Sequence, residues 1–385
     1  MHRVGVNNLT LLKSGTDYFP QLCADIDAAL HSIYLETYIF AADETGRRVA
    51  DALQRAASRG VSVYVLLDGY GSAEFPESWI DDLRASGVVL HWYRREISPF
   101  TRRRNWKRRL RRMHRKMVAV DDDIAYVGGI NIIDDIPHEH ELGVPRLDYA
   151  VRVQGAQSGA IRFAMMRLWE VVSWVALRKR VKSIGWRLRR SGLGSDARVS
   201  LLLRDNVRHR RDIEHAYIAA IEGAQREIII ANAYFLPGRT FLRALRHAAR
   251  RGVRVTLLLQ GKVEYRLQHF ATLALYDQLL AAGVEIYEYQ PSFLHAKVAV
   301  VDGEWATLGS FNIDPFSLLL AREANLAIRD SGFSNALRDS LMRAIEQEGR
   351  HVMPEQASVM VRIAARISFR LIRFVIGILG IANKH

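Results

Sequence analysis

One sequence pattern occurs twice in this chain and constrains its fold more than any other feature. The first copy begins at His114 and ends at Asn131, the second begins at His295 and ends at Asn312, and both fit H-x-K-x4-D-x6-G-[GS]-x-N without a gap. Alternating apolar residues follow each lysine, as in a β-strand, so the histidine and lysine of each copy should point to one face. Such a repeat predicts a chain folded as two similar halves.

The sequence around the motifs repeats as well. Residues 59–69 (RGVSVYVLLDG) resemble residues 251–261 (RGVRVTLLLQG). Each stretch follows a helical pattern, and an apolar, aromatic run lies before that pattern. This order of short apolar strands and helices predicts an α/β unit built twice. We therefore expect an α/β fold with two halves related by pseudo-two-fold symmetry and an active site at their junction.

The length and composition suit this organisation. The 385 residues divide into a first half at 1–160, a basic amphipathic linker at 161–195, a second half at 196–350 and a basic amphipathic tail at 351–385. A hydrophobic content of 49% supports a sizeable core and excludes wholesale disorder. The single cysteine, Cys23, excludes an internal disulfide framework and fits a reducing cytoplasm.

The motif side chains predict phosphodiester chemistry without a metal or another cofactor. Two imidazoles and two ammonium groups around one point would repel each other unless an anion lay between them. One histidine can attack phosphorus while the other protonates the leaving oxygen. Lys116, Lys297, Asn131 and Asn312 would stabilise the charge that builds on the phosphate oxygens.

Four carboxylates complete the predicted site. Asp121 and Asp302 belong to the catalytic motif, but each stands where a strand stops and is expected to fix the turn. Glu323 and Asp148 lie in apolar, strand-like runs, where a lone carboxylate needs a partner. We expect them to hold the second ring nitrogen of the catalytic histidines, with Glu323 orienting His295 and Asp148 orienting the first motif histidine.

The net charge of +14 is concentrated in three segments that contain no acidic residue. Residues 101–112 hold eight lysines and arginines, residues 176–190 hold seven, and residues 357–385 hold five. The first segment is expected to face a charged headgroup, whereas residues 161–190 fit either packing between the halves or insertion at a membrane interface. In the tail, arginines fall on one helical stripe and apolar residues on another, namely Arg362, Arg366, Arg370 and Arg373 opposite Ile363, Ile367 and Leu371. This pattern predicts a helix that binds an anionic membrane.

Several other readings are weaker. No signal peptide pattern opens the sequence, and the longest uncharged apolar run is too short to span a bilayer, so we expect a peripheral protein on the cytoplasmic face.

Residues 138–141 (HEHE) could suggest a metal site, but they have no further ligands at a recognisable spacing. Basic runs also suit DNA phosphates. We expect no nucleic-acid partner, because the basic residues alternate with apolar ones.

At the duplicated motif the chain resembles the phospholipase D superfamily, over roughly residues 5–350. Within it the chain is most similar to bacterial cardiolipin synthases of the short type without N-terminal membrane spans, at residues 35–40 (LETYIF), 204–214 (RDNVRHRRDIE) and 231–238 (ANAYFLPG). One departure is Gly129 where the second copy has Ser310, which removes a possible hydroxyl donor.

The resemblance implies two phospholipase D-like halves and a covalent phosphohistidine intermediate. It also implies that His114 is the nucleophile and His295 the acid and base, with the opposite assignment open. The implied reaction transfers a phosphatidyl group to a hydroxyl of phosphatidylglycerol or a related lipid. The alternative is a hydrolase of the same superfamily, either a phospholipase D or a nuclease.

Overall fold

The computed structural model describes residues 7–95, 111–136, 143–177, 198–205, 208–315, 317, 320–353 and 359–378. The chain forms two compact units, one of Met1–Asp135 and Ala150–Leu201 and the other of Ile136–Tyr149 and Leu202–His385. The unit boundaries thus differ from the predicted division near residue 160, because residues 136–149 belong to the second unit. Three segments of the sequence analysis lie outside the described residues, namely most of the basic run 101–112, the HEHE sequence at 138–141 and residues 178–195.

The first unit is built on a seven-stranded mixed sheet with the order β1-β7-β6-β5-β2-β3-β4. Its strands are β1 (Asn8–Lys13), β2 (Ser32–Thr37), β3 (Ser62–Asp68), β4 (Val89–Tyr93), β5 (Met117–Val120), β6 (Ile124–Gly128) and β7 (Tyr149–Gln154). Strands β2, β3 and β4 run parallel, whereas β5 pairs antiparallel with β2 and β6. The parallel part corresponds to the predicted strand, helix, strand, helix, strand order.

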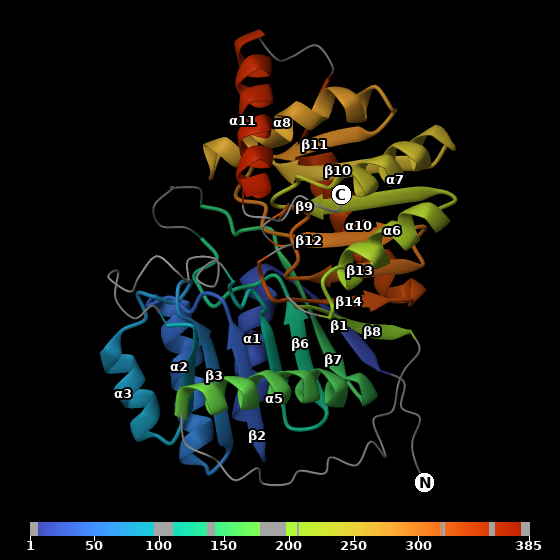
Figure 1. The fold of residues 1–385 in the computed structure, drawn as a ribbon. Helices are drawn as coiled ribbons and strands as arrows, with labels where there is room; N and C mark the ends of the chain where they lie inside the picture. The colour runs from blue at the N-terminus through green and yellow to red at the C-terminus, as the bar shows by residue number, and fades with distance from the viewer. Residues whose placement is uncertain are drawn as a thin grey trace. The chain divides into compact units, whose positions relative to one another are not determined.

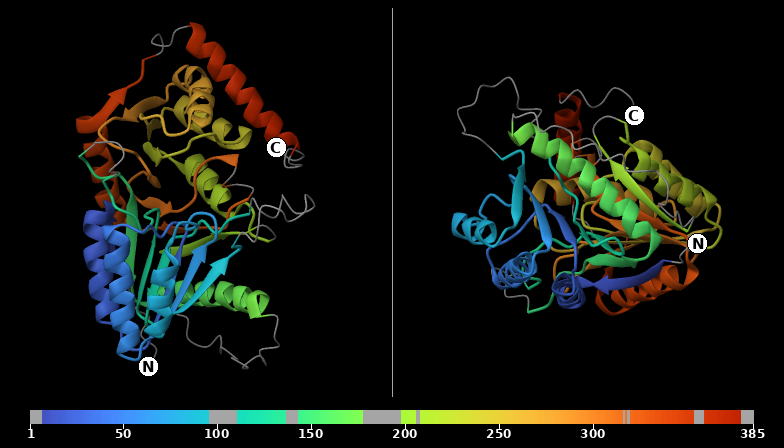
Figure 2. Two further views of the ribbon diagram at one scale, coloured as in Figure 1. Left: turned by 90° about the vertical axis from the view of Figure 1, so that its left-hand side faces the viewer. Right: turned by 90° about the horizontal axis from the view of Figure 1, so that it is seen from below.

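Helices cover both faces of this sheet (Figure 2). Helices α1 (Ser14–Asp27), α2 (Glu44–Ser58) and α3 (Glu77–Ala85) share one face, and α5 (Ala156–Leu177) covers the other. The alternation along β3 explains the two layers, because Val65 and Leu67 join the core cluster of α1 to α3, whereas Leu66 packs with Leu168 of α5. Helix α2 begins at the N-cap Asp43, whose carboxylate accepts the Gly46 N–H at 2.8 Å.

The second unit repeats this topology in an eight-stranded sheet with the order β15-β11-β10-β9-β12-β13-β14-β8. Its strands are β8 (Val199–Arg204), β9 (Glu227–Asn232), β10 (Arg254–Gln260), β11 (Glu285–Tyr289), β12 (Lys297–Val301), β13 (Trp305–Gly309), β14 (Glu323–Ile328) and β15 (Gly349–His351). Strands β9, β10 and β11 run parallel, and β12 pairs antiparallel with β9, as in the first sheet. Without the extra edge strand β15, the two orders are identical, and the prediction of an α/β fold built twice is confirmed.

Five helices of the second unit matter for the site and its surroundings. They are α6 (Asp212–Gly223), α7 (Arg239–Arg250), α8 (Arg266–Leu280), α10 (Ser331–Glu348) and α11 (Val359–Ile378). Helices α6, α7 and α8 bury apolar side chains against one face of the sheet, and α11 packs against α8 (Figure 1). None of the described helices is long and apolar enough to cross a membrane.

Two predicted segments are more integrated than the sequence suggested. The segment predicted as a linker at 161–195 contains most of α5, whose Leu168 and Val172 pack on the first sheet. The tail is helical as predicted, but one face of α11 is buried, since Ala365, Ser368 and Ile372 pack inward and Ile372 joins the core cluster of the second unit. Both helices bury an apolar face that the arrangement of charges in the sequence did not reveal.

Candidate active site

Both motif histidines stand at the start of a central strand. His114 lies three residues before β5, and His295 lies two residues before β12. Each motif lysine donates a hydrogen bond to the backbone carbonyl of the histidine two residues earlier, Lys116 at 2.9 Å and Lys297 at shorter range. Both lysine side chains are buried. The local structure of the two motifs is therefore alike, as their sequences predict.

The second motif contains a histidine and carboxylate pair. Nδ1 of His295 lies 2.6 Å from Oδ2 of Asp148. An ionised carboxylate only accepts hydrogen bonds, so Nδ1 carries the proton and Nε2 is left to exchange a proton or attack phosphorus. The sequence analysis assigned Glu323 to His295 and Asp148 to His114, and that pairing is wrong for Asp148.

Backbone contacts explain why Asp148 belongs with His295. Residues 144–149 leave the first sequence half and run beside the second motif, with a parallel bridge between Leu147 and Leu294. The Leu147 N–H donates to the Phe293 carbonyl at 3.0 Å, and the His295 N–H donates to the Leu147 carbonyl at 2.9 Å. The prediction failed because it counted residues within each half and so assumed that each carboxylate stayed with its own motif.

Lys297 combines complete burial with nearby negative charge. Its side chain is 0% exposed, and Nζ lies 4.0 Å from Oδ2 of Asp148. Burial lowers the pKa of Lys297 to about 8, although the negative charges of Asp148, Glu323 and Glu264 act in the opposite direction. The ammonium group is therefore still mostly protonated at neutral pH and can stabilise an anion.

The first motif has an aromatic neighbour. The ring of Tyr38, just after β2, lies edge to face with the His114 imidazole at a centroid distance of 4.8 Å. Nζ of Lys116 stands 5.2 Å from the centroid of the same ring. Tyr38 thus packs against both reactive side chains and restricts their rotamers.

The motif aspartates hold the strands rather than line the site. Asp121 accepts the backbone N–H groups of Leu30, His31 and Ser32 at the start of β2, at 2.7–2.9 Å. Asp302 does the same at the start of β9 with residues 225–227, at 2.8–2.9 Å. Both have positive φ angles, of 51° and 55°. Burial opposes ionisation, but the three N–H donors prevail and lower both pKa values. The structure supports the expected turn-fixing role.

A second duplicated contact was missed by the sequence analysis. Oδ2 of Asp68 accepts the N–H of Met113 at 2.8 Å, and Oε1 of Gln260 accepts the N–H of Leu294 at 3.1 Å. Met113 and Leu294 directly precede the motif histidines. The signal was present in the sequence, because the repeated stretches 59–69 and 251–261 both end in a polar residue followed by glycine.

The asparagines and the Gly-Ser pair have defined contacts. Oδ1 of Asn131 accepts the Ile39 N–H at 3.3 Å, which leaves the amide nitrogen as the donor. Asn312 is buried. The Ser310 hydroxyl donates to Oε2 of Glu323 at 2.6 Å. The first motif has Gly129 in place of Ser310 and therefore lacks the hydroxyl that contacts a carboxylate in the second unit. The role of Glu323 in orienting a histidine stays a prediction.

A buried ion pair lies beside the first motif. Arg115, between the motif histidine and lysine, stands 3.7 Å from Oε2 of Glu36, and both side chains are almost fully buried. Two charges removed from water in this way impose a strict geometric requirement on the start of β5. Neither residue was predicted to form this pair, because an arginine between two basic motif residues resembles further surface charge.

Comparisons with known proteins agree with this geometry. The family model described as cardiolipin synthase, phospholipase D-like domain, matches residues 22–141 and 217–345. The chain is 40% identical over 351 residues to cardiolipin synthase B of Escherichia coli (strain K12), covering 90% of this chain and 82% of that one. It is 32% identical over 330 residues to the major cardiolipin synthase ClsA of Bacillus subtilis (strain 168), covering 84% and 66%.

Among solved structures, phosphatidylserine synthase of Haemophilus influenzae Rd KW20 has a similar fold, with a TM-score of 0.68 at 16% identity over 95% of this chain and 93% of that one. The family match covers both repeats, including the first motif histidine and lysine at 114 and 116 and the second at 295 and 297. The chain belongs to the cardiolipin synthase family of phospholipase D-like enzymes.

Proposed function

We propose that this enzyme makes cardiolipin from phosphatidylglycerol and a second phospholipid, and that the reaction passes through a covalent phosphohistidine without a metal. The donor lipid supplies its phosphatidyl group and releases its headgroup alcohol. The acceptor lipid supplies the hydroxyl that takes its place. The family match supports phosphatidyl transfer, and the duplicated histidine and lysine pair supports the route.

In the first step Nε2 of His114 attacks the phosphorus of the donor. A P–N bond forms, the P–O bond to the headgroup alcohol breaks, and protonated His295 gives its Nε2 proton to the departing oxygen. In the second step His295 takes the proton of the acceptor hydroxyl, whose oxygen attacks phosphorus and displaces His114. Lys116 and Lys297 stabilise the charge on the phosphate oxygens in both steps.

The observation that carries this proposal is the contact between His295 and Asp148. A carboxylate at Nδ1 fixes the tautomer in which Nε2 can take or give a proton, and it stabilises the imidazolium that forms. A histidine held in this way fits proton transfer between alcohol oxygens. The amide nitrogen of Asn131 is a further donor for the phosphate oxygens.

The test uses the purified protein with labelled phosphatidylglycerol in mixed micelles. Formation of cardiolipin together with one equivalent of glycerol supports the proposal. Formation of phosphatidic acid alone favours the alternative, a phospholipase D. Cleavage of DNA under the same conditions without lipid turnover would instead identify a nuclease. A covalent intermediate is sought by denaturing the enzyme during turnover at mildly alkaline pH, because the P–N bond of a phosphohistidine hydrolyses in acid. A phosphatidyl group is then detected on a peptide that contains His114.

We also propose that the enzyme attaches to an anionic membrane on its cytoplasmic face. Ile367, Leu371 and Phe374 on the outer side of α11 are 61%, 46% and 65% exposed, at spacings of four and three residues. The exposed Arg366 and Arg370 lie beside this stripe. Apolar side chains next to arginines suit a bilayer interface with anionic headgroups.

A further inference from the structure

A pocket in the second unit lies where the parallel strands β9 and β10 end. The space between its walls is about 380 Å³, a volume that includes open solvent at the mouth. It is lined by residues that follow β9, by the stretch from the end of β10 to the start of α8, and by the inner side of α8, among them Tyr234, Phe235, Gln260, Glu264, His269 and Tyr276. The carboxyl ends of parallel strands are a frequent place for ligands in α/β folds.

The pocket adjoins the second catalytic motif. Gln260 lines the pocket and also accepts the N–H of Leu294, the residue before His295, at 3.1 Å. The charge of Glu264 acts on Lys297, whose pKa it raises against the larger effect of burial. Two residues of the pocket wall therefore act on the second motif, Gln260 through the backbone before His295 and Glu264 through its charge on Lys297.

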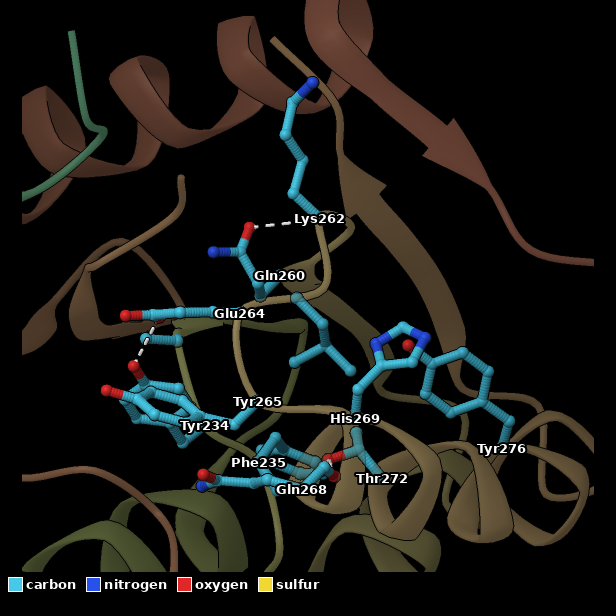
Figure 3. Close-up of a pocket in the computed structure, with 12 residues that line it drawn as sticks. Tyr234, Phe235, Gln260, Lys262, Glu264, Tyr265, Gln268, His269, Thr272 and Tyr276 are labelled. Carbon is cyan, nitrogen blue, oxygen red and sulfur yellow. Dashed lines mark hydrogen bonds between the residues drawn. The ribbon is translucent and has the colours of Figure 1, made fainter. Parts of the chain in front are cut away.

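Hydrogen-bonding groups line two sides of the pocket. Figure 3 shows Tyr234, Gln260 and Glu264 on one side and His269 and Tyr276 on the other. The Tyr234 hydroxyl donates to Oε2 of Glu264 at 2.5 Å. The carbonyl oxygen of Gln260 accepts two backbone N–H groups, from Leu294 and Lys262, so its amide nitrogen is the donor that remains for a ligand.

The charges in the pocket favour a neutral polyol over a phosphate. Lys262 and Glu264 line the pocket with opposite charges that offset each other, so the lining supplies no net positive charge for a phosphate, whereas the carboxylate accepts hydroxyl protons well. Burial lowers the pKa of His269, which keeps that ring neutral near pH 7 and able to accept or donate one hydrogen bond. The aromatic walls, Phe235 and Tyr276, suit the carbon skeleton of a polyol.

Apolar residues project from the outer wall of the pocket. Val263 and Leu267 belong to the same stretch as the lining residues, as does Tyr265, which itself lines the pocket, and the three are 51%, 45% and 58% exposed. Exposed apolar side chains in such a cluster fit lipid better than water. A headgroup in the pocket could thus remain attached to acyl chains that lie against these three residues.

We propose that this pocket binds the glycerol hydroxyls on the alcohol side of the reaction, through Tyr234, Glu264 and Gln260. The inference rests on the proposed function and assigns a place to its alcohols. Glycerol that leaves the donor and the glycerol headgroup of an acceptor phosphatidylglycerol have the same chemistry. One pocket beside His295 therefore serves both alcohols. In the first step it holds the glycerol oxygen that takes up a proton, and in the second step it holds the acceptor hydroxyl that loses its proton.

The experiment separates alcohol recognition from phosphorus chemistry. The donor is phosphatidyl-p-nitrophenol, whose leaving group is not a glycerol and needs little protonation. The acceptor is phosphatidylglycerol in one arm and free glycerol in the other. Tyr234→Phe and Glu264→Gln are compared with two matched controls outside the pocket, Tyr287→Phe and Glu304→Gln, and melting temperatures are measured for all four variants.

In both pocket variants we expect transfer to the acceptor to fall at least tenfold further than release of p-nitrophenol, with a matching rise in phosphatidic acid. Loss in both arms identifies the hydroxyls as the recognised group, and loss in the lipid arm alone means that recognition needs the attached lipid. Equal loss of transfer and release, or no change in their ratio, would overturn the inference. If the wild-type enzyme transfers to free glycerol but forms no cardiolipin, the proposed function is overturned and the pocket assignment stands. If it transfers to neither acceptor, the proposed function and the pocket assignment are both rejected.

Discussion

Asp148 and His295 stand 147 positions apart in the sequence, yet their side chains meet at 2.6 Å. We expect Asp148→Asn to lower kcat by roughly a hundredfold or more, because the amide can present the wrong hydrogen-bonding group to Nδ1 and no longer stabilises the imidazolium. The pH dependence should separate this positioning role from a structural one, since the limb of the kcat profile that reports the acid form of His295 should shift to lower pH.

The matched control for that variant is Asp122→Asn, which removes an exposed carboxylate of the first unit. It should leave both kcat and the profile unchanged. If Asp148→Asn were fully active, or if it lost activity with an unshifted profile, orientation of His295 by Asp148 would be the wrong explanation.

The two motif histidines should both be essential. We expect His114→Ala and His295→Ala each to lower cardiolipin formation by at least about a thousandfold with the fold intact, since residues that act as one unit cannot replace each other. Circular dichroism and melting temperature check the fold. Substantial turnover in either variant would mean that the reaction does not use both motifs.

The first half-reaction can distinguish the roles of the histidines. If His114 is the nucleophile, His295→Ala should still form some labelled phosphohistidine from an activated donor such as phosphatidyl-p-nitrophenol, whereas His114→Ala should form none. The reverse result would exchange the two roles.

Lys297 predicts how activity depends on pH. Its pKa of about 8 lies below that of an ordinary lysine because of burial, so kcat/KM should fall as pH rises through about 8 and the ammonium loses its proton. Folding stability should change with pH in the opposite direction to activity. Between that pH and the ordinary lysine pKa, the unfolded chain binds a proton that the folded chain has lost, so this residue makes the folded state more stable as pH rises.

The measurement for Lys297 is a pH series of kcat/KM together with urea unfolding midpoints for wild type and Lys297→Met. The methionine variant should be inactive, and its stability advantage over wild type should be largest below pH 8 and shrink above it. An advantage that did not change with pH would show that Lys297 does not titrate in this range.

Asp302 should matter for stability more than for chemistry. Its carboxylate accepts three backbone N–H groups at the start of β9, so we expect Asp302→Ala to destabilise the second unit by about 3 kcal/mol. Urea unfolding gives this value, and kcat per folded molecule should stay within a few fold of wild type. A large loss of kcat without loss of stability would place Asp302 in the reaction instead.

The outer face of α11 should control attachment to lipid. Leu371→Glu combined with Phe374→Glu should lower binding to vesicles that contain phosphatidylglycerol, by roughly tenfold or more, since two exposed apolar side chains are replaced by charges of the same sign as the lipid. Cosedimentation with vesicles measures the effect. Arg243→Glu on α7 serves as a control for net charge, and unchanged binding of the double variant would exclude this face.

Deleting the whole tail would be a poorer experiment, because Ile372 on the inner side of α11 belongs to the core cluster of the second unit. Removal of the helix would uncover α8 and change stability together with binding. Substitutions on the outer face avoid this complication.

The motif and its duplication predicted the α/β fold and the local structure of both histidine and lysine pairs, because each motif is a short strand whose geometry depends on adjacent residues. Asp121 and Asp302 could also be interpreted correctly, since a carboxylate at a strand end has few partners besides the next turn. These features depend on local sequence.

The contacts of Asp148 could not be predicted in the same way. Its partner depends on which unit residues 136–149 join, and the backbone pairing of Leu147 with Leu294 decides that. The buried faces of α5 and α11 were hidden for a similar reason, because small residues such as Ala365 and Ser368 form the contact surface and carry little hydropathy signal. The pocket beside α8 depends on residues from three separate segments.

Helix α8 contacts both features, since α11 packs against it and its inner side lines the pocket. If α11 rests on a bilayer, the enzyme meets its lipids in two dimensions. Turnover should then follow the mole fraction of phosphatidylglycerol in the surface rather than its amount per volume, so dilution of the micelles with inert detergent should slow the reaction even when the total lipid stays constant.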